Sequence, residues 1–512
     1  MSGRVHKSIL NAEVNLVFYF LSLFLAFFSR KIFLDCLGAD FIGLTATLGN
    51  ILGYLNLAEL GISSCISFFL FKPLQTDNHE TINEIMSVFG YLYRCIGLLI
   101  LGGGIFVSLF FPIIFGAENV GMGIVFFSFY SFIGSSLIGY FINYRQILLS
   151  ADQKKYVVTS YMQSAAILKT ALQIFLAYNY RNLYVWVAVE FVFGIIACII
   201  LNWKIGKEYP WLKADKRKGK IYLSKYPEIL INTRQIFIHK IKDFLLSKSD
   251  ELFIFAFVSL KMVAYYGNYA MIIAKLNYLF NSLLDSAMAG VGNLIAEGNK
   301  QSILKVFWEL TTIRHFLAGI MCFVIFHFIE SFISIWLGPE YILSRSILTL
   351  LCIYIYIGIS RGTVDMYNHA HGLYADVWSA WTELAINIVV TIIAGYYWGI
   401  VGILLGKIIS TGIIVVFWKP YYLFIFGLHE SYRSYWLGAS RNYLVTGLSL
   451  FSAHSLLSFI TINSSDSYYS WFIYCSIGLA LYLFVNILLT ALFCKGAKDT
   501  IIRIKNLLSK LT

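Results

Sequence analysis

Residues 183–203 read LYVWVAVEFVFGIIACIILNW, an apolar stretch whose only charged side chain is that of Glu190. A helix of about 20 apolar residues crosses the roughly 30 Å hydrocarbon core of a bilayer. The whole chain has this character, because 59% of its 512 residues are hydrophobic and only 13% are charged. Ordinary soluble domains carry about 25% charged residues. The sequence therefore predicts an all-α integral membrane protein and argues against a soluble enzyme.

Apolar blocks of this kind recur along the chain and predict about fourteen membrane-spanning helices. We expect them near residues 14–37, 41–70, 90–115, 121–145, 156–178, 183–203, 236–260, 263–295, 310–335, 343–368, 378–397, 399–418, 440–462 and 468–494. All six prolines lie at or outside the ends of these blocks. A proline there removes no helical hydrogen bond, so we expect no proline-hinged span.

Lysine and arginine gather in alternate connections, which indicates the orientation of the chain. The connection at 204–235 contains the run WLKADKRKGK, whereas the turns near 116–120, 397–399 and 463–467 contain no lysine or arginine. Basic connections stay on the cytoplasmic side of a membrane. We therefore expect both termini and residues 204–235 to be cytoplasmic in a multi-pass inner-membrane protein. The net charge of +12 then indicates topology and not nucleic-acid binding.

Two stretches resemble one another and indicate an internal repeat. SLFFPIIFG (108–116) and ESFISIWLG (330–338) each close a helix with an aromatic-aliphatic run and a glycine. Two similar halves are a common way to build a transporter with a central site. We expect two six-helix lobes around a central cavity, followed by a helix pair. The predicted parts are an N-terminal lobe (1–203), a basic linker (204–235), a second lobe (236–418), a terminal helix pair (419–494) and a basic amphipathic cytoplasmic tail (495–512).

The order of several stretches resembles Wzx-type polysaccharide flippases of the multidrug/oligosaccharidyl-lipid/polysaccharide (MOP) exporter superfamily. The matching stretches are LGADFIGL (37–44), NLAELGI (56–62), YRQILLSADQKKY (144–156), KSDELFIFAFVSLKMVAYYGNY (248–269), AGVGNLIAEGN (289–299), SIWLGPEY (334–341), NHAHGLYADVW (368–378) and WGIVGILLGKIIS (398–410). The resemblance covers nearly the whole chain, and the terminal helix pair fits the fourteen-span members of the superfamily.

This resemblance implies a flippase that moves an undecaprenyl-pyrophosphate-linked oligosaccharide repeat from the cytoplasmic to the periplasmic leaflet. Such repeats are assembled into O-antigen, capsule or exopolysaccharide. The expected partners are this lipid-linked oligosaccharide, membrane lipid, a coupling ion (H⁺ or Na⁺) and polysaccharide polymerase machinery. We expect no cofactor and no nucleic acid.

Charged side chains inside the spans are the candidate functional residues, because each is costly in hydrocarbon unless it faces a cavity or a partner. A lipid-linked diphosphate requires a cationic cavity, for which the candidates are Arg30, Lys248, Lys275 and Arg361. The acidic candidates for ion coupling or charge pairing are Glu59, Asp250, Asp285, Asp365 and Glu383. The eight cysteines stand singly without metal-ligand spacing, and no catalytic arrangement is evident. We expect neither a catalytic nor a metal site.

Each candidate has a structural alternative. Arg30 lies near a helix end, where a basic side chain can extend to the interface. Lys248 and Asp250 can lie on an amphipathic cytoplasmic half-helix. Arg361 and Asp365 stand four residues apart and can neutralise one another. For Glu59 and Glu383, pairing with a cation and binding of a coupling ion both remain open, and His454 is interpreted as a packing residue.

Two other functions remain open at this stage. A multidrug or metabolite exporter of the same superfamily requires a narrower, more apolar and acidic cavity. A membrane polysaccharide polymerase or ligase commonly requires a long periplasmic loop, and every outer loop predicted above is short.

Overall fold

The structure is a computed structural model that describes residues 2–59, 61–116, 118, 120–285, 288–373 and 376–499. Within the helices, the structure describes every side chain except those of residues 2–9, 12, 58, 64, 235–236, 238–240, 242–243, 247–248, 281–290, 293 and 296. The described residues form helices and contain no strand, so the predicted all-α class is confirmed. Most of the tail predicted at 495–512 lies outside the described residues.

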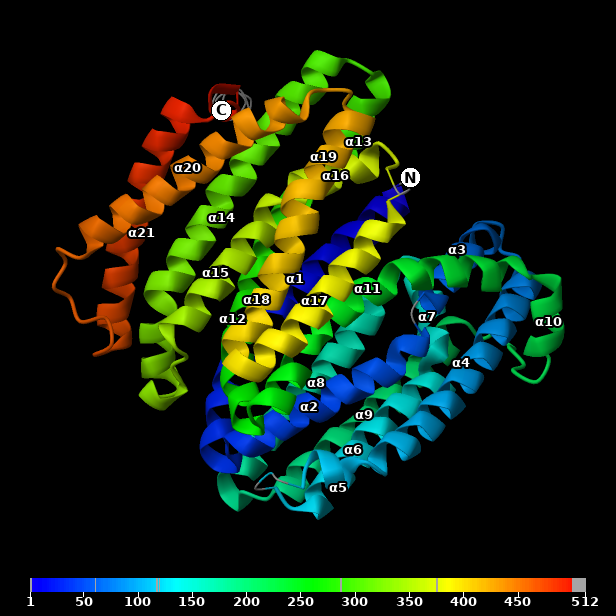
Figure 1. Cartoon of the computed structure of the whole chain (residues 1–512). Coiled ribbons are helices and arrows are strands. Elements are labelled where there is room, and N and C mark those ends of the chain that lie inside the picture. The colour runs from blue at the N-terminus through cyan, green and yellow to red at the C-terminus, as the bar shows by residue number, and fades with distance from the viewer. Residues whose placement is uncertain are drawn as a thin grey trace. The chain divides into compact units, whose positions relative to one another are not determined.

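The chain divides into two compact units, Met1–Ala264 and Tyr265–Thr512. The first unit, whose α-helices are labelled in Figure 1, consists of α1 (Ser2–Leu37), α2 (Ala39–Leu55), η1 (Asn56–Glu59), α3 (Ile62–Gln75), α4 (His79–Ser108), α5 (Phe111–Ile114), α6 (Met122–Phe141), η2 (Asn143–Arg145), α7 (Gln146–Ala151), α8 (Lys155–Tyr180), α9 (Leu183–Glu208), α10 (Gly219–Lys225) and α11 (Glu228–Phe257).

The helix α12 (Leu260–Asp285) begins at the end of the first unit and continues into the second. The other elements of the second unit are α13 (Met288–Glu297), α14 (Lys300–Trp336), η3 (Pro339–Tyr341), α15 (Arg345–Ser360), α16 (Gly362–Ala370), α17 (Val377–Trp398), α18 (Ile400–Thr411), η4 (Gly412–Trp418), α19 (Lys419–Tyr422), η5 (Leu423–Gly427), α20 (Tyr432–Leu457) and α21 (Tyr468–Phe493).

Nine helices among the described residues are long and apolar enough to cross a membrane, and Cys65–Gln75 is a shorter apolar helix. Many large apolar side chains of the nine helices, such as Phe24, Phe106 and Phe484, are exposed. An exposed apolar surface of this kind is stable only in lipid. The chain is therefore a multi-pass membrane protein, and the expected number of about fourteen spans is consistent with the helices.

The core of the first unit lies among α3, α4, α7 and α10, where Ile66, Ile82 and Leu148 are fully buried. The helix α11 packs against α2 and α3 of the same unit. Its Phe244 ring meets the Tyr54 ring edge-on, with 5.5 Å between the centroids. The lobe boundaries expected at 203 and 236 remain predictions, but the packing groups α11 with the helices that precede it.

The connection between α9 and α11 is fixed to the first turns of α4. The Asn83 side chain accepts a hydrogen bond from the Lys213 backbone N–H at 2.6 Å, and the Ser87 hydroxyl accepts one from the Asp215 backbone N–H at 2.9 Å. These bonds satisfy backbone groups that would otherwise need water. The basic connection is therefore a docked part of the first unit.

In the second unit, α14 packs against α15, α15 against α18, and α18 against α17. The helices α20 and α21 pair with one another and pack on α14, as Figure 1 shows for the orange and red part of the chain. The Trp471 indole of α21 donates a hydrogen bond to the Phe328 carbonyl of α14 at 3.0 Å. The terminal helix pair is therefore anchored to the rest of its unit.

One expectation about proline is wrong. Pro420 was expected outside the spans, but it lies within a continuous helical stretch from Ile400 to Gly427. The segments on either side of it, Gly412–Trp418 and Leu423–Gly427, are π-helical. The wider π turn changes which carbonyl each N–H reaches, so the helix continues past a residue that has no N–H.

Two glycines one turn apart bring α18 into close contact with α17. A Cβ atom on Gly402 would lie 2.0 Å from the Ala394 carbonyl oxygen, and one on Gly406 would lie 2.2 Å from the Thr391 hydroxyl oxygen. Glycines spaced by four residues allow two membrane helices to approach this closely. The α17–α18 pair therefore depends on the absence of side chains at these two positions.

We predict that Gly402→Leu will separate α17 from α18 and destabilise the protein by about 1–3 kcal/mol, the usual cost of overpacking. The measurement is thermal unfolding of the purified protein in detergent. Gly412→Leu is the matched control, because no atom lies within 4 Å of the added Cβ. Equal stability of the two variants would contradict the packing described here.

Candidate functional site

A break in a predicted span places Glu59 at the centre of a polar cavity in the first unit. The span expected at 41–70 consists of α2, the single turn η1 and α3. Gly61 has a φ of 96°, a conformation that glycine adopts without strain, and α3 begins directly after it. Discontinuous helices in transporters commonly mark binding sites.

The Glu59 carboxylate is held by hydroxyl groups from α3, α4 and α6. One oxygen accepts hydrogen bonds from the Ser63 hydroxyl at 3.0 Å and from the Tyr93 hydroxyl. The other accepts a hydrogen bond from the Tyr140 hydroxyl at 2.7 Å. Both tyrosines are buried, so these donors stabilise a charge where little water is available.

The cavity beside this carboxylate has a volume of about 260 Å³. Its polar lining includes Asn56, Ser136 and Gln146 in addition to the groups around Glu59. A polar space of this size holds water or a small hydrated cation. Among the described residues, no group of three or more His, Cys, Asp and Glu side chains is arranged to hold a metal ion. A single carboxylate among hydroxyls suits a proton or a sodium ion better than a transition metal.

Besides Glu59, the structure describes the side chains of two predicted residues in the first unit. The Arg30 guanidinium donates a hydrogen bond to the Ala264 carbonyl at 3.0 Å, which links α1 to the first turn and a half of α12. Asp250 on α11 is buried, and the adjacent Glu251 accepts a short hydrogen bond from the Asn50 side chain of α2. The side chains of Lys248 and Asp285 lie outside the described residues.

In the second unit, Arg361 and Asp365 form an ion pair of 3.1 Å, which is the structural alternative stated for them. The two side chains are about one-third exposed. Glu383 on α17 is 2% exposed, and Lys275 on α12 is half-buried. The structure brings Arg361 and Asp365 together, and the substrate-binding role of the four cations remains a prediction.

Sequence reasoning missed a second set of buried charges in the same unit. Glu309 and Arg314 on α14 are each 3% exposed. The Arg314 guanidinium lies against Gly362, where a Cβ atom would approach its Nη1 to 2.1 Å. Lys407 on α18, by contrast, is recognisable in the sequence as a charge inside the span predicted at 399–418, and its ammonium lies 4.8 Å from the centre of the Tyr354 ring. The signal for the missed residues was the pair of charges in ELTTIR (309–314), at the start of the span predicted at 310–335.

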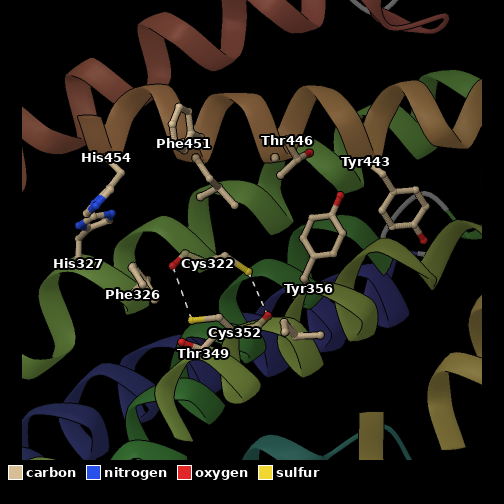
Figure 2. A pocket seen from close by; sticks show the side chains of 13 residues that line it. Cys322, Phe326, His327, Thr349, Cys352, Tyr356, Tyr443, Thr446, Phe451 and His454 are labelled. Carbon is tan, nitrogen blue, oxygen red and sulfur yellow. Dashed lines mark hydrogen bonds between the residues drawn. The ribbon is translucent and has the colours of Figure 1, made fainter. Parts of the chain in front are cut away.

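An apolar pocket of about 430 Å³ lies between α14, α15 and α20 in the second unit (Figure 2). His327 and His454 face one another at one end, with 5.1 Å between their ring centroids. The Cys322 thiol donates a hydrogen bond to the Cys352 carbonyl at 3.2 Å. His454 is therefore a pocket-lining residue on the terminal helix pair, in contact with a second histidine.

Comparison with known proteins identifies the fold. The chain is similar to the structure of the lipid II flippase MurJ in an inward closed conformation, with 16% identity, a TM-score of 0.69 and coverage of 94% of this chain and 98% of that chain. It is also similar to an inward-facing multidrug resistance MATE family transporter of the MOP superfamily, with 13% identity, a TM-score of 0.58 and coverage of 82% and 99%.

The sequence matches no protein-family model, and no curated protein matches it. At the identities given above, structural likeness establishes the fold alone. The protein therefore has the all-α fold of these two structures, and the predicted fold class is confirmed. The narrower resemblance to Wzx-type flippases stays an expectation.

Proposed function

We propose that this protein is a flippase that moves a lipid-linked oligosaccharide diphosphate from the cytoplasmic to the outer leaflet of the inner membrane. Its fold is shared with a protein named as a flippase of lipid II and with a multidrug transporter. We infer that the two six-helix lobes predicted from the sequence alternately open a central cavity, which is the usual mechanism for repeated transporter halves.

The observation that favours a lipid-linked substrate is the terminal helix pair and the pocket that it covers. The structure of the lipid II flippase aligns with 94% of this chain. The structure of the multidrug transporter aligns with only 82% of this chain, although 99% of the transporter itself is aligned. The pocket beneath α20 is lined almost entirely by apolar atoms, including those of Phe326, Leu450 and Phe451. An apolar groove of this kind suits a hydrocarbon tail better than a polar solute.

The diphosphate of the substrate requires positive charge in a partly dehydrated site, since charge-assisted contacts to phosphate are strongest there. Arg30, Lys248 and Lys275 are the proposed contacts. Arginine binds phosphate oxygens through two parallel N–H groups, which lysine cannot reproduce. The proposed pathway is the assembly of O-antigen, capsule or exopolysaccharide together with a polysaccharide polymerase.

We predict that purified protein in liposomes will move a fluorescent polyprenyl diphosphate oligosaccharide between leaflets, measured as loss of protection from an added membrane-impermeant quencher. Arg30→Ala will slow this exchange about tenfold or more, the cost of one charged hydrogen bond to phosphate. Arg30→Lys will restore part of the rate.

The matched control is Lys31→Ala, because Lys31 neighbours Arg30 and its exposed side chain pairs only loosely with Asp35 at 3.9 Å. The proposal fails if wild-type protein leaves the diphosphate lipid protected. Transport of a cationic dye in its place would favour the multidrug exporter. Polymerisation of the labelled lipid would favour the polymerase or ligase.

Glu59 is the proposed site for the coupling ion, because its carboxylate lies in a polar cavity at a helix break. Glutamine keeps the size of the side chain and one accepting oxygen, but it binds neither a proton nor a sodium ion in this way. We predict that Glu59→Gln will abolish the acceleration of transport by a proton or sodium gradient and leave the gradient-free rate intact. Glu80→Gln, at an exposed position of α4, is the control. Unchanged acceleration in Glu59→Gln would exclude this role.

A further inference from the structure

Three cations of the first unit lie close together where α4, α6 and the connection before α10 meet. The Lys216 ammonium donates a hydrogen bond to the Phe141 carbonyl, the last of α6, and lies 4.6 Å from the centre of the Tyr144 ring. The Arg145 guanidinium lies 5.9 Å from the same ring. Burial lowers the pKa of Lys216, and the positive charges of Arg145 and Arg94 lower it further. Arg94 lies about one helical turn beyond Gly90 on α4, and the Lys216 side chain packs against Gly90. The three positive charges therefore lie in the same region of the first unit.

Within the described part of the chain, none of Arg94, Arg145 and Lys216 forms an ion pair with a carboxylate. Other lysines of the same region are paired: Lys225 contacts Glu84 at 2.7 Å, and Lys204 contacts Glu208 at 3.1 Å. An uncompensated group of three cations is the arrangement that an anion stabilises.

The position of Lys216 is fixed by close packing. A Cβ atom on Gly90 would lie 2.9 Å from the Lys216 Cγ, and one on Gly219 would lie 2.4 Å from the Ser87 carbonyl oxygen. The backbone N–H groups of Lys213 and Asp215, just before Lys216, donate hydrogen bonds to the side chains of Asn83 and Ser87 and hold this segment against α4. The ammonium group is therefore placed by the fold and is not the end of a freely moving surface chain.

The cations stand at the boundary between polar and lipid-facing surface. Arg94 is the last charged residue of α4, and Arg145 is the first charged residue after α6, which has none. Both helices are apolar enough to cross the membrane. Beyond Arg94, Leu98 and Leu99 are exposed, and Ile142 is exposed at the end of α6. Charged groups at such a boundary lie at the level of lipid headgroups.

We propose that Arg94, Arg145 and Lys216 form a binding site for the phosphate of a membrane lipid, whose hydrocarbon tail lies along the exposed apolar surface of α4 and α6. The adjoining apolar surface favours a lipid-borne phosphate over a free one. Two arginines supply planar N–H groups for the phosphate oxygens, and Lys216 supplies a fixed third charge. The site is distinct from the Glu59 cavity and does not depend on the proposed transport function.

The position of Lys216 also has a purely structural explanation, because a cation near the last carbonyls of a helix stabilises that helix. The test therefore uses the arginines. Purified full-length protein and an Arg94→Gln/Arg145→Gln variant are titrated with phosphatidylglycerol, a polyprenyl diphosphate and inorganic pyrophosphate, and bound species are counted by native mass spectrometry. Lys218→Gln/Lys220→Gln is the control, because it removes the same charge from exposed positions of the same connection.

Each cation near an anionic lipid contributes about fivefold in affinity, so the arginine double variant should bind lipid phosphate about thirtyfold more weakly. The control should match wild type. If the arginine variant loses more affinity for phosphatidylglycerol, the site binds a structural phospholipid. If it loses more affinity for the polyprenyl diphosphate, the site binds a substrate-type lipid. Either result supports the site. Equal affinity in the arginine variant and the control overturns it, as does binding of pyrophosphate as tight as that of either lipid. If the double variant does not fold, Arg94→Gln alone should lose about fivefold.

Discussion

The cost of placing an ionisable side chain in hydrocarbon is the constraint on which the rest of this structure depends. The protein meets it in several ways. Lys169 and Glu190, within adjacent spans, form an ion pair of 2.6 Å, and Arg361 pairs with Asp365. Glu59 is surrounded by hydroxyl donors instead of a cation. We infer that the paired charges are structural. The Glu59 carboxylate in its polar cavity and the cations Arg94, Arg145 and Lys216 are the groups for which we propose bound ligands.

The sequence predicted the fold class because it depends on properties that are local in the chain. Apolar blocks such as residues 183–203 determine which segments can cross a membrane, whatever their neighbours are. The break at Asn56–Gly61 was not predicted, because NLAELGI is apolar enough to continue a helix and the conformation of Gly61 depends on its packing. Pro420 was misjudged for a similar reason, since a π-helical turn is not visible in hydropathy.

The candidate site was only partly predictable. Glu59 was identified as a charge inside a span, but its partners Tyr93 and Tyr140 come from two other helices and are distant in sequence. Tyrosine is common in membrane proteins at the interface, so composition gave no reason to select these two. The proposed role of Arg94 and Arg145 likewise depends on the packing of α4 against α6, and on the connection that places Lys216 against Gly90 of α4 and the Phe141 carbonyl of α6. Proximity between distant residues is the information that a single sequence lacks.

The proposed activity is translocation of a lipid-linked oligosaccharide. It rests on the fold shared with a lipid II flippase, on the apolar pocket beneath the terminal helix pair and on cationic residues inside the predicted spans. The most direct test is made in the cells that produce the protein, by removing it and measuring lipid-linked oligosaccharide and surface polysaccharide together. The account predicts that the lipid-linked repeat accumulates in the inner membrane while surface polysaccharide is lost, since synthesis continues and only translocation stops. Normal surface polysaccharide without accumulation of the repeat would contradict it.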